Sequence, residues 1–489
     1  MKFYSVKEGK FQMDIDSLSK YLAKKGFYSL VSSEGQHWLL KIENKTVTRI
    51  EKEDVYNYLL DTANKEKYSL SQFRTIAIDR LTKLRGRIVT SIPILLPKFE
   101  GEFYAETKTS GIMIFKNVVV KVTAEKIEQE PIEKADKFIW ENSIIQRSFI
   151  GTIPDLIYEL EGDFQKFMSY ISSYIGEDGL ESLYSIYGFL LHSYKDKTFT
   201  KAVIFYDMNI NDADPNGRTG KSLLTSSLQY FRPTVIEDGK NLNPKNQFSF
   251  SRVKNFPKIF IIDDIKKKFP FDILFTLVSG DFAYERKTMD REVIPFEISP
   301  KIVITSNFDV PGMNQSHKDR RIEYVISDFF DAEYKPCTVF DREFFTDWDD
   351  TEWGRFDVMG IKALQLYLQK GIIQQQPGKP YYLLTKTTSD EFMTSADSLK
   401  TGIRYNIDEQ HNLFLQNNIK HPRINQNTFS RWMKMYASYK NWDINHSHSN
   451  NVKFIEFTER DSKRDRHEAT KQSSEPVTNQ EVVTSVTTI

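Results

Sequence analysis

A short glycine-containing stretch, Asp214–Ser222, constrains this chain more than any other feature. Its sequence is Asp-Pro-Asn-Gly-Arg-Thr-Gly-Lys-Ser, and it follows the apolar run Ala202–Tyr206. Apolar residues then recur at helical spacing over Leu223–Tyr230. A strand, a glycine-containing turn, Lys-Ser and a helix together cradle phosphate groups, because backbone N–H groups and the helix N-terminus point at the anion. The stretch therefore predicts a phosphate-binding loop.

The loop departs from the usual pattern at one position. The pattern G-x-x-x-x-G-K-[ST] expects Gly at position 215, where this chain has Pro215 and the glycine follows at Gly217. Gly217 and Gly220 still allow a phosphate to approach the backbone closely. Lys221 is expected to reach the β/γ-phosphates of a nucleotide, and the Ser222 hydroxyl is expected to bind Mg²⁺. The predicted nucleotide-binding residues are Asn216, Gly217, Arg218, Thr219, Gly220, Lys221 and Ser222.

Composition limits the partners and the compartment. Lys+Arg and Asp+Glu balance at 67 each, so contact with nucleic acid must come from a local patch and not from an overall basic field. The single cysteine, Cys337, excludes an internal disulfide framework and a Cys-based zinc site. No apolar run approaches the length that spans a bilayer, and the N-terminus lacks a signal-peptide pattern. We expect a soluble, cytoplasmic protein without a membrane partner.

Residues 1–150 are expected to form an accessory α+β domain without catalytic chemistry. Asp14 and Asp16 are a carboxylate pair, but they stand at a helix start, so we expect Asp16 to cap a helix over Ser17–Lys25 that ends at Gly26. Further elements are expected as strands at His37–Glu43 and Thr46–Ile50, helices over 53–65 and 71–84, and a hairpin of Ile112–Phe115 and Val118–Val122.

Residues 151–197 have a helical period, with apolar side chains at i, i+3 and i+4 from Phe164 to Ile175 and from Leu180 to Tyr187. Two interpretations stay open for this region: a spacer packed on its neighbours, or a collar through which copies of the chain associate.

Residues 198–345 alternate short apolar strands with helical or loop segments, as a parallel sheet covered by helices requires. The expected strands are Ala202–Tyr206, Thr234–Ile236, Lys258–Ile262 and Lys301–Thr305. We therefore expect an α/β nucleotide-binding core at the centre of the chain.

A helix over 358–370 and a linker over 374–380 complete the region 346–380, and a small C-terminal unit follows over 381–458. The helix Thr428–Lys440 has an apolar face, and the strand Val452–Phe457 follows it. Helix and β-structure in this order are typical of a winged helix, which would place a basic helix on DNA. The alternative is a structural cap whose Arg and Lys side chains are solvated. The tail 459–489 has no periodicity and is expected to be disordered.

Polar residues at the ends of two strands are expected to act on a nucleotide held by the predicted loop. Asp263 and Asp264 follow the strand Lys258–Ile262, where acids can hold Mg²⁺ and polarise an attacking water. We expect Asp263 to serve the metal, directly or through water, and Asp264 to position or deprotonate the water. Asn307 follows the next strand, and its amide could hydrogen-bond the water or the γ-phosphate. The predicted metal ligands are Ser222 and Asp263.

Two groups of basic residues complete the candidate site. Phe282–Phe296 has two β-type arms around a polar turn, with Arg286, Lys287 and Arg291 near its tip, where a DNA strand's phosphates could bind. A solvated edge hairpin is the alternative. Arg320 and Arg321 precede another apolar strand and suit an arginine finger that reaches a neighbouring subunit's γ-phosphate.

The order of these motifs resembles the superfamily III helicases, AAA+-type motors of small viruses, phages and plasmids, and within them the phage and mobile-element primase–helicase type. The resemblance covers about 195–345 most strongly and extends more weakly over 105–195. The motifs are Gly217–Ser222, Ile259–Asp264, Ser279–Asp281 with Arg286 and Lys287, Ile304–Asn307 and Asp319–Arg321, with Phe115–Thr123 and Phe138–Trp140 further upstream.

The resemblance implies an AAA+-like core in a hexameric ring that hydrolyses ATP with Mg²⁺ and moves along single-stranded DNA, typically 3′ to 5′, unwinding forked DNA. By the same resemblance, Asn307 is the sensor, Lys287 the DNA contact in the pore, and Arg320 or Arg321 the finger. No Asp-x-Asp strand pair of a fused primase is visible, so a primase or other replication proteins would be separate partners. A bacterial host cytoplasm is the implied compartment for a phage or mobile-element protein.

Two other functional classes stay open from the sequence. A nucleotide-gated origin-binding or loader ATPase without processive unwinding would use the C-terminal unit for duplex recognition. A defence or signalling NTPase would use the same core, and the basic hairpin argues against it.

Overall fold

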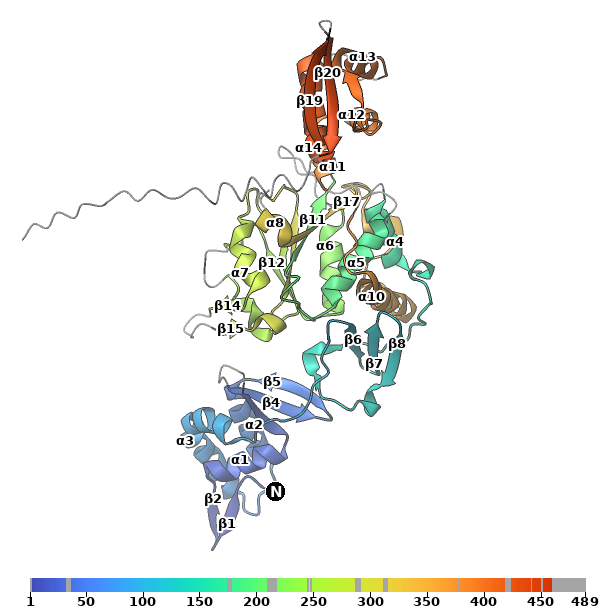
Figure 1. The fold of residues 1–489 in the computed structure, drawn as a ribbon. Coiled ribbons are helices and arrows are strands. Elements are labelled where there is room, and N and C mark those ends of the chain that lie inside the picture. Colours follow the sequence, from blue (N-terminus) through green and yellow to red (C-terminus); the bar gives the residue numbers. More distant parts are fainter. Residues whose placement is uncertain are drawn as a thin grey trace, which may run out of the picture. The chain divides into compact units, whose positions relative to one another are not determined.

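The computed structural model describes residues 2–31, 37–173, 178–208, 218–243, 246, 249–285, 292–310, 315–375, 379–417, 424–440, 442–449 and 452–459 (Figure 1). The chain divides into two compact units, Met1–Gln376 and Pro377–Ile489. Within the described ranges, no helix is both long and apolar enough to cross a membrane. The domain limits expected from the sequence stay predictions.

The first unit begins with small strands and three helices around an aromatic-rich core. In chain order the elements are β1 (Ser5–Lys7), β2 (Lys10–Gln12), α1 (Ile15–Lys24), β3 (Phe27–Val31), β4 (His37–Glu43), β5 (Thr46–Ile50), α2 (Lys52–Lys65) and α3 (Gln72–Leu95). β3, β4 and β5 are antiparallel neighbours, and β9 (Ile139–Trp140) adds a parallel strand beside β5. α1, α2 and α3 bury residues such as Leu18, Leu59 and Leu81 in one core.

Two expectations for this region were wrong in detail. The N-cap of α1 is Asp14, whose carboxylate accepts a hydrogen bond from the Ser17 N–H, and Asp16 lies in the first turn. The helix expected over 71–84 continues to Leu95, because Ile88 and Ile92 keep its apolar face buried beyond Leu84.

A second sheet follows, with order β10-β6-β7-β8. Its strands are β6 (Ser110–Phe115), β7 (Val118–Thr123), β8 (Ile127–Pro131) and β10 (Ile144–Ile145), and the predicted hairpin is confirmed as the antiparallel pair β6–β7. Two ion pairs, one of them fully buried, connect this region to elements that follow it in the sequence. Arg232 pairs with Glu106 at 2.7 Å, and Arg147 pairs with Asp357.

The centre of the unit is a five-stranded sheet with order β12-β13-β16-β11-β17, and all four neighbouring pairs are parallel. Its strands are β11 (Ala202–Asp207), β12 (Thr234–Asp238), β13 (Ile259–Asp263), β16 (Lys301–Ser306) and β17 (Arg321–Ile326). β11, β13 and β16 are buried along almost their whole length, which explains their continuous apolar sequences. The predicted parallel α/β sheet is therefore confirmed.

Helices α4 (Asp163–Ser172), α5 (Gly179–Leu191) and α10 (Asp350–Lys370) share one core with the second sheet and the parallel sheet. Phe164, Phe167, Leu183 and Tyr187 are all buried in it. The choice between the spacer and collar interpretations of residues 151–197 stays open. α10 begins eight residues before the expected position 358, because Asp349 caps it and accepts a hydrogen bond from the Glu352 N–H at 2.8 Å.

Shorter elements complete the unit. They are α6 (Lys221–Ser226), α7 (Phe275–Ser279), β14 (Phe282–Tyr284), β15 (Glu292–Ile294), α8 (Gln315–Asp319) and α9 (Pro336–Phe340). The helix expected over Leu223–Tyr230 is α6 followed by a 3-10 turn, Ser227–Tyr230. Serine hydroxyls compete for the backbone there, since Ser227 Oγ donates to the Leu224 carbonyl at 2.6 Å.

The second unit has its own core and an antiparallel sheet of order β18-β20-β19. Its elements are α11 (Lys379–Thr387), α12 (Asp390–Ala396), β18 (Arg404–Asn406), α13 (Ile407–Asn417), α14 (Gln426–Lys440), β19 (Trp442–Ser449) and β20 (Val452–Glu459). The predicted helix followed by β-structure is present as α14 and the hairpin β19–β20, and Phe429, Trp432 and Tyr436 form its buried face. The tail from residue 460 lies outside the described residues.

Candidate functional site

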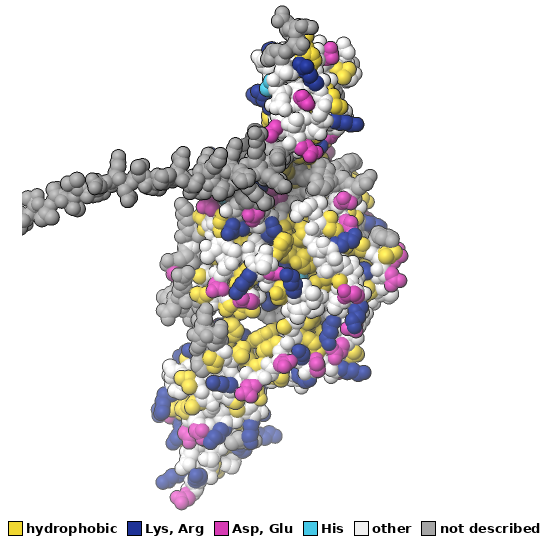
Figure 2. Space-filling view, viewed as in Figure 1, with side chains coloured by type: hydrophobic (Ala, Val, Ile, Leu, Met, Phe, Trp, Pro, Cys, Tyr) yellow, Lys and Arg dark blue, Asp and Glu magenta, His cyan; other side chains and the backbone are white. Residues whose placement is uncertain are grey.

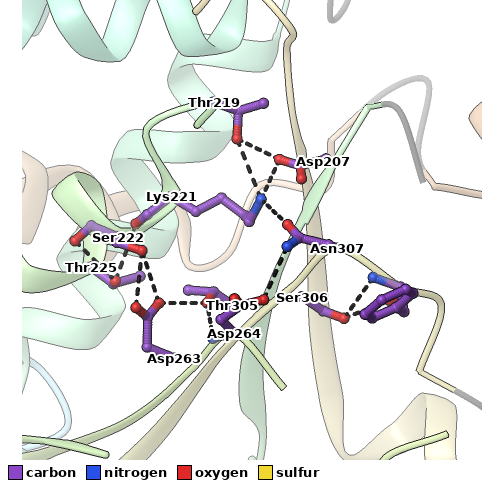
Figure 3. A network of polar contacts seen from close by, with 11 residues as sticks. Asp207, Thr219, Lys221, Ser222, Thr225, Asp263, Asp264, Thr305, Ser306 and Asn307 are labelled. Atoms are coloured by element: carbon purple, nitrogen blue, oxygen red, sulfur yellow. Dashed lines mark hydrogen bonds and ion pairs between the residues drawn. The ribbon is translucent and has the colours of Figure 1, made fainter. Parts of the chain in front are cut away.

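The candidate site lies where the parallel strands end. β11 ends at Asp207, β13 at Asp263 and β16 at Ser306, and the register places these ends at one edge of the sheet. The carboxyl ends of parallel strands face the same way, so residues distant in sequence meet there. Figure 3 shows side chains from β11, α6, β13 and β16 pointing toward one another at this edge.

Lys221 occupies the centre of the site, with its ammonium group buried. It forms an ion pair with Asp207, a hydrogen bond to Asn307 Oδ1 at 2.8 Å and a longer one to Thr219 Oγ1 at 3.4 Å. Thr219 also donates to Asp207. Burial lowers the pKa of Lys221 below its ordinary value, while the Asp207 carboxylate acts in the opposite direction.

Ser222 and Asp263 form the second part of the site. The Ser222 hydroxyl lies 3.1 and 3.0 Å from the two oxygens of the Asp263 carboxylate. Thr305, on the neighbouring strand β16, donates to the same carboxylate at 2.6 Å. These contacts fix the orientation of the Asp263 oxygens toward the start of α6.

Asp264 is held from both sides by side chains of other elements. Asn307 Nδ2 donates to one carboxylate oxygen at 3.0 Å, and Lys240 pairs with the other at 2.5 Å. The Asp264 N–H donates to Thr305 Oγ1 at 2.7 Å, and its backbone has φ +55°. A left-handed conformation at a non-glycine residue persists only where the surroundings hold it, as these contacts do.

Gly220 shapes the backbone immediately before Lys221. Its φ is +95°, and a Cβ there would lie 2.8 Å from the ring of Phe167. Arg218 also has positive φ, at +85°, and is exposed. The connection from β11 to α6 covers residues 208–220, which is longer than the predicted loop pattern. Pro215, Asn216 and Gly217 lie outside the described residues.

The structure thus brings together six of the predicted site residues: Thr219, Lys221, Ser222, Asp263, Asp264 and Asn307. The predicted basic hairpin is present as the antiparallel arms β14 and β15, with Phe282 opposite Ile294. Arg286, Lys287 and Arg291 lie outside the described residues, so their role stays a prediction.

The two candidate finger residues lie away from this cluster, at the other end of β17. In the β11–β17 register, Arg321 lies opposite Ala202 at the start of β11, whereas Asp207 is the last residue of that strand. Arg321 is buried, and its guanidinium donates to the backbone carbonyls of His317 and Val310 at 3.1 and 3.0 Å. Arg320 is partly exposed, lies over the Phe275 ring at 4.8 Å and donates from Nη1 to the Ser316 carbonyl at 3.1 Å. Arg320 is therefore the more accessible of the two, and neither residue reaches Lys221 of its own chain.

Three residues of the site were missed by the sequence analysis. Asp207, Thr305 and Lys240 each contact a predicted residue directly. Asp207 and Thr305 carry a usable signal, because a polar residue at the carboxyl end of a buried parallel strand faces the same sheet edge as the phosphate loop. Lys240 carries none, since an exposed lysine in a loop is common.

Comparisons with known proteins leave the family open. No protein-family model matches the chain, and no curated protein matches its sequence. A JCV helicase with a bound thiazolopyridine acetamide aligns with 48% of this chain and 64% of its own, at 12% identity and a TM-score of 0.28. Drosophila ORC bound to DNA aligns with 67% of this chain and 96% of its own, at 10% identity and a TM-score of 0.18. The chain spans less than two thirds of the JCV helicase chain. Similarity this weak fixes neither the fold family nor the activity.

Proposed function

We propose that this protein is an AAA+-like ATPase that acts on DNA as a replicative helicase. The observation that carries the proposal is the meeting of Lys221, Ser222, Asp263, Asp264 and Asn307 at the carboxyl edge of one parallel sheet. They come from three separate segments, and the resemblance assigns each of them a task in phosphoryl transfer. A chance phosphate-loop pattern would not gather the other residues around it.

The donors present fit Mg²⁺ that is shared with a nucleotide. Ser222 and Asp263 supply hard oxygen atoms side by side, and no group of three or more Asp, Glu, His or Cys side chains forms a closed metal cage in the described ranges. Mg²⁺ takes few protein ligands at such sites and keeps waters and phosphate oxygens. When bound, the ion neutralises charge that develops on the phosphates.

The chain's own residues divide the remaining work. Lys221 has a buried ammonium group that would bind the β/γ-phosphates in place of Asp207. Asp264 would orient the attacking water and accept its proton. Asn307 contacts both Lys221 and Asp264, and as the sensor its amide would hydrogen-bond the γ-phosphate or the attacking water. Arg320 is the better finger candidate, because it is partly exposed whereas Arg321 is buried. A finger at that end of β17 can serve only a neighbouring subunit.

The distance of the finger candidates from Lys221 of the same chain supports an assembly in which each site lies between two copies. We propose that this assembly is a hexameric ring. Arg286, Lys287 and Arg291 are the proposed contacts to single-stranded DNA, and the substrate for unwinding would be forked DNA. A separate primase is a proposed partner.

ATP hydrolysis measured with and without single-stranded DNA tests the proposal. Single-stranded DNA should stimulate hydrolysis by the assembled protein, and Lys221→Ala should abolish hydrolysis. Lys266→Ala is the matched control, because this exposed lysine follows β13 outside the cluster. Hydrolysis by the assembled wild-type protein that DNA leaves unchanged would contradict the DNA-motor proposal.

A loader or origin-binding ATPase is the second candidate, favoured by the helix–hairpin arrangement of α14, β19 and β20. A forked substrate separates the two, because a loader binds the duplex without displacing a strand. Replacing both Arg286 and Lys287 by Ala adds a further distinction. A motor would lose unwinding and keep basal hydrolysis, whereas a signalling ATPase would be indifferent to the change.

A further inference from the structure

Positive charge is concentrated in the first hundred residues of an otherwise balanced chain. Residues 1–100 hold 18 Lys and Arg and 12 Asp and Glu, whereas the whole chain holds 67 of each. In Figure 2, dark-blue Lys and Arg side chains gather over the part of the molecule that contains α1, α2 and α3. A local surplus of this kind attracts a polyanion even when the net charge of the protein is zero.

Helix α3 carries most of this surplus. Its 24 residues include Arg74, Arg80, Lys83, Arg85 and Arg87 against a single acid, Asp79. Arg80, Lys83 and Arg87 follow i, i+3, i+7 spacing and therefore share one face, which lies beside the buried face of Ala77, Leu81 and Ile88. All five basic side chains of α3 are exposed.

Among the residues that the structure describes, two of these guanidinium groups have no partner. Lys83 pairs with Asp79 at 2.6 Å, and Arg85 pairs with Glu53 at 3.3 Å. Arg80 and Arg87 make no ion pair or hydrogen bond with any residue that the structure describes. Five donors in a planar fork on each group are thus available for an external oxygen-rich ligand.

Gly86 is an independent observation on the same exposed side. It lies in the middle of α3, three residues after Lys83, and a Cβ at this position would meet nothing within 4 Å. Glycine inside a helix lowers helix stability relative to alanine. Among the described residues, no close contact requires a glycine at position 86, and its backbone does not have a positive φ. A position without a side chain lets another molecule approach the helix closely.

We propose that the exposed face of α3 binds the phosphodiester backbone of a nucleic-acid duplex. The duplex lies along Arg80, Lys83 and Arg87, and one of its strands comes closest at Gly86. Arginine predominates, and it binds phosphate oxygens through two parallel hydrogen bonds. The face holds no aromatic side chain on which an unpaired base could stack, so the contact is to backbone phosphates and independent of sequence. This contact is separate from the ATPase site and needs no nucleotide.

Fluorescence anisotropy of the full-length protein tests the proposal, with a labelled blunt DNA duplex of about two helical turns. The comparison is between wild type, Arg80→Ala/Arg87→Ala and the control Lys20→Ala/Lys65→Ala. The control removes the same charge from α1 and α2, where each lysine is paired with an aspartate at 2.6 Å. Titrations without nucleotide, between about 50 mM and 200 mM salt, give affinity and its salt dependence.

The α3 variant should bind the duplex about tenfold more weakly than the control, and the slope of log K against log salt should fall by about two, one unit for each lost phosphate contact. Equal affinity and slope for the two variants would overturn the proposal. A duplex RNA probe is expected to behave like the DNA, because the contact is to backbone phosphates. Binding of wild type to phosphatidylserine vesicles but not to either duplex would replace nucleic acid by a membrane surface and overturn the proposal as well.

Gly86→Ala tests the close approach without the risk of unfolding. The substitution should raise the thermal midpoint, because alanine favours the helix, and at the same time weaken duplex binding. Undiminished affinity of Gly86→Ala would contradict the close approach. ATP hydrolysis is measured separately on the same variants, so loss of the ATPase proposal and loss of this one give different results.

Discussion

At the scale of single residues, the buried pair Asp207–Lys221 is the main departure from expectation. The phosphate-loop pattern predicts where Lys221 is in the sequence and what it binds, but not what holds it without a ligand. Among the residues that the structure describes, the polar partners of its ammonium group are the side chains of Asp207, Asn307 and Thr219. A phosphate group that binds this ammonium group would compete with the Asp207 carboxylate for it.

Removing Asp207 should destabilise the protein by leaving a buried charge without its partner. We expect Asp207→Ala to lower the free energy of unfolding by about 3 kcal/mol. Lys221→Met in the same background should recover much of this loss, because the uncompensated charge is gone. Denaturant unfolding of the two single variants and the double variant gives the coupling between the residues.

A matched control for this cycle is the exposed ion pair of Glu161 with Arg355, at 3.6 Å. Glu161→Ala should change stability by no more than about 0.5 kcal/mol. A coupling energy near zero for Asp207 and Lys221 would contradict the importance assigned to the buried pair.

Lys195 gives a pH-dependent prediction. Burial beside the Phe296 ring, 4.3 Å from the ammonium nitrogen, lowers the pKa of Lys195 to about 8. In the unfolded chain this lysine stays protonated to about pH 10.5, so between pH 8 and 10 the unfolded state binds more protons and stability should rise with pH. The gain should be about 2 kcal/mol over that range.

Thermal unfolding of wild type and Lys195→Met across pH 7 to 10 isolates this contribution from the other buried lysines. The variant should be the more stable protein at pH 7, and its stability should rise less steeply above pH 8. Parallel pH profiles would show that Lys195 does not titrate in the folded protein as described.

At the scale of elements, two helices beside the parallel sheet pack so closely that only a small residue fits between them. α5 and α10 approach each other at Gly188, where a Cβ would lie 2.0 Å from the Ala363 carbonyl oxygen. The sequence predicted both helices from their apolar spacing, but not that they pair, because periodicity identifies a buried face and not its partner. For the same reason the end of α3 could not be predicted. The helix continues past Leu84 because other residues cover Ile88 and Ile92, and the sequence does not show which residues these are.

Gly188→Ala should therefore destabilise the first unit. The carbonyl is backbone and cannot move aside cheaply, so we expect a loss of about 1–3 kcal/mol. Glu181→Ala on the same helix is the control, since it removes only a surface pair with Lys370 at 2.6 Å. Denaturation midpoints of the two variants measured side by side give the comparison. Similar midpoints would contradict the close packing of α5 on α10.

At the scale of the whole molecule, the sequence predicted individual strands and helices better than the contacts between them. The parallel sheet could be predicted because β11, β13 and β16 are continuous apolar runs that end in polar residues. The pairing of Glu106 with Arg232 could not, because the two residues are distant in sequence and neither belongs to a recognisable pattern. Buried polar partners of this kind are found only when the fold brings them together.

The second unit should fold without the first. It buries its own cluster, which includes Phe392, Phe414, Trp432 and Tyr436. We expect residues 377–459 produced alone to unfold cooperatively on heating, with helical and strand content matching α11–α14 and β18–β20. Circular dichroism measures both properties. A fragment that melts without a sigmoidal transition would show that this core depends on the rest of the chain.

The uneven charge of the first hundred residues has a consequence for handling the protein. With a pI of about 7.1, the chain has almost no net charge at neutral pH, and the residues after position 100 therefore carry an acidic surplus that balances α3 and its neighbours. A basic surface on a chain without net charge still attracts a negative surface locally. The protein should be retained by cation and anion exchangers in the same neutral buffer, and losing Arg80 and Arg87 should shorten retention on the cation exchanger alone.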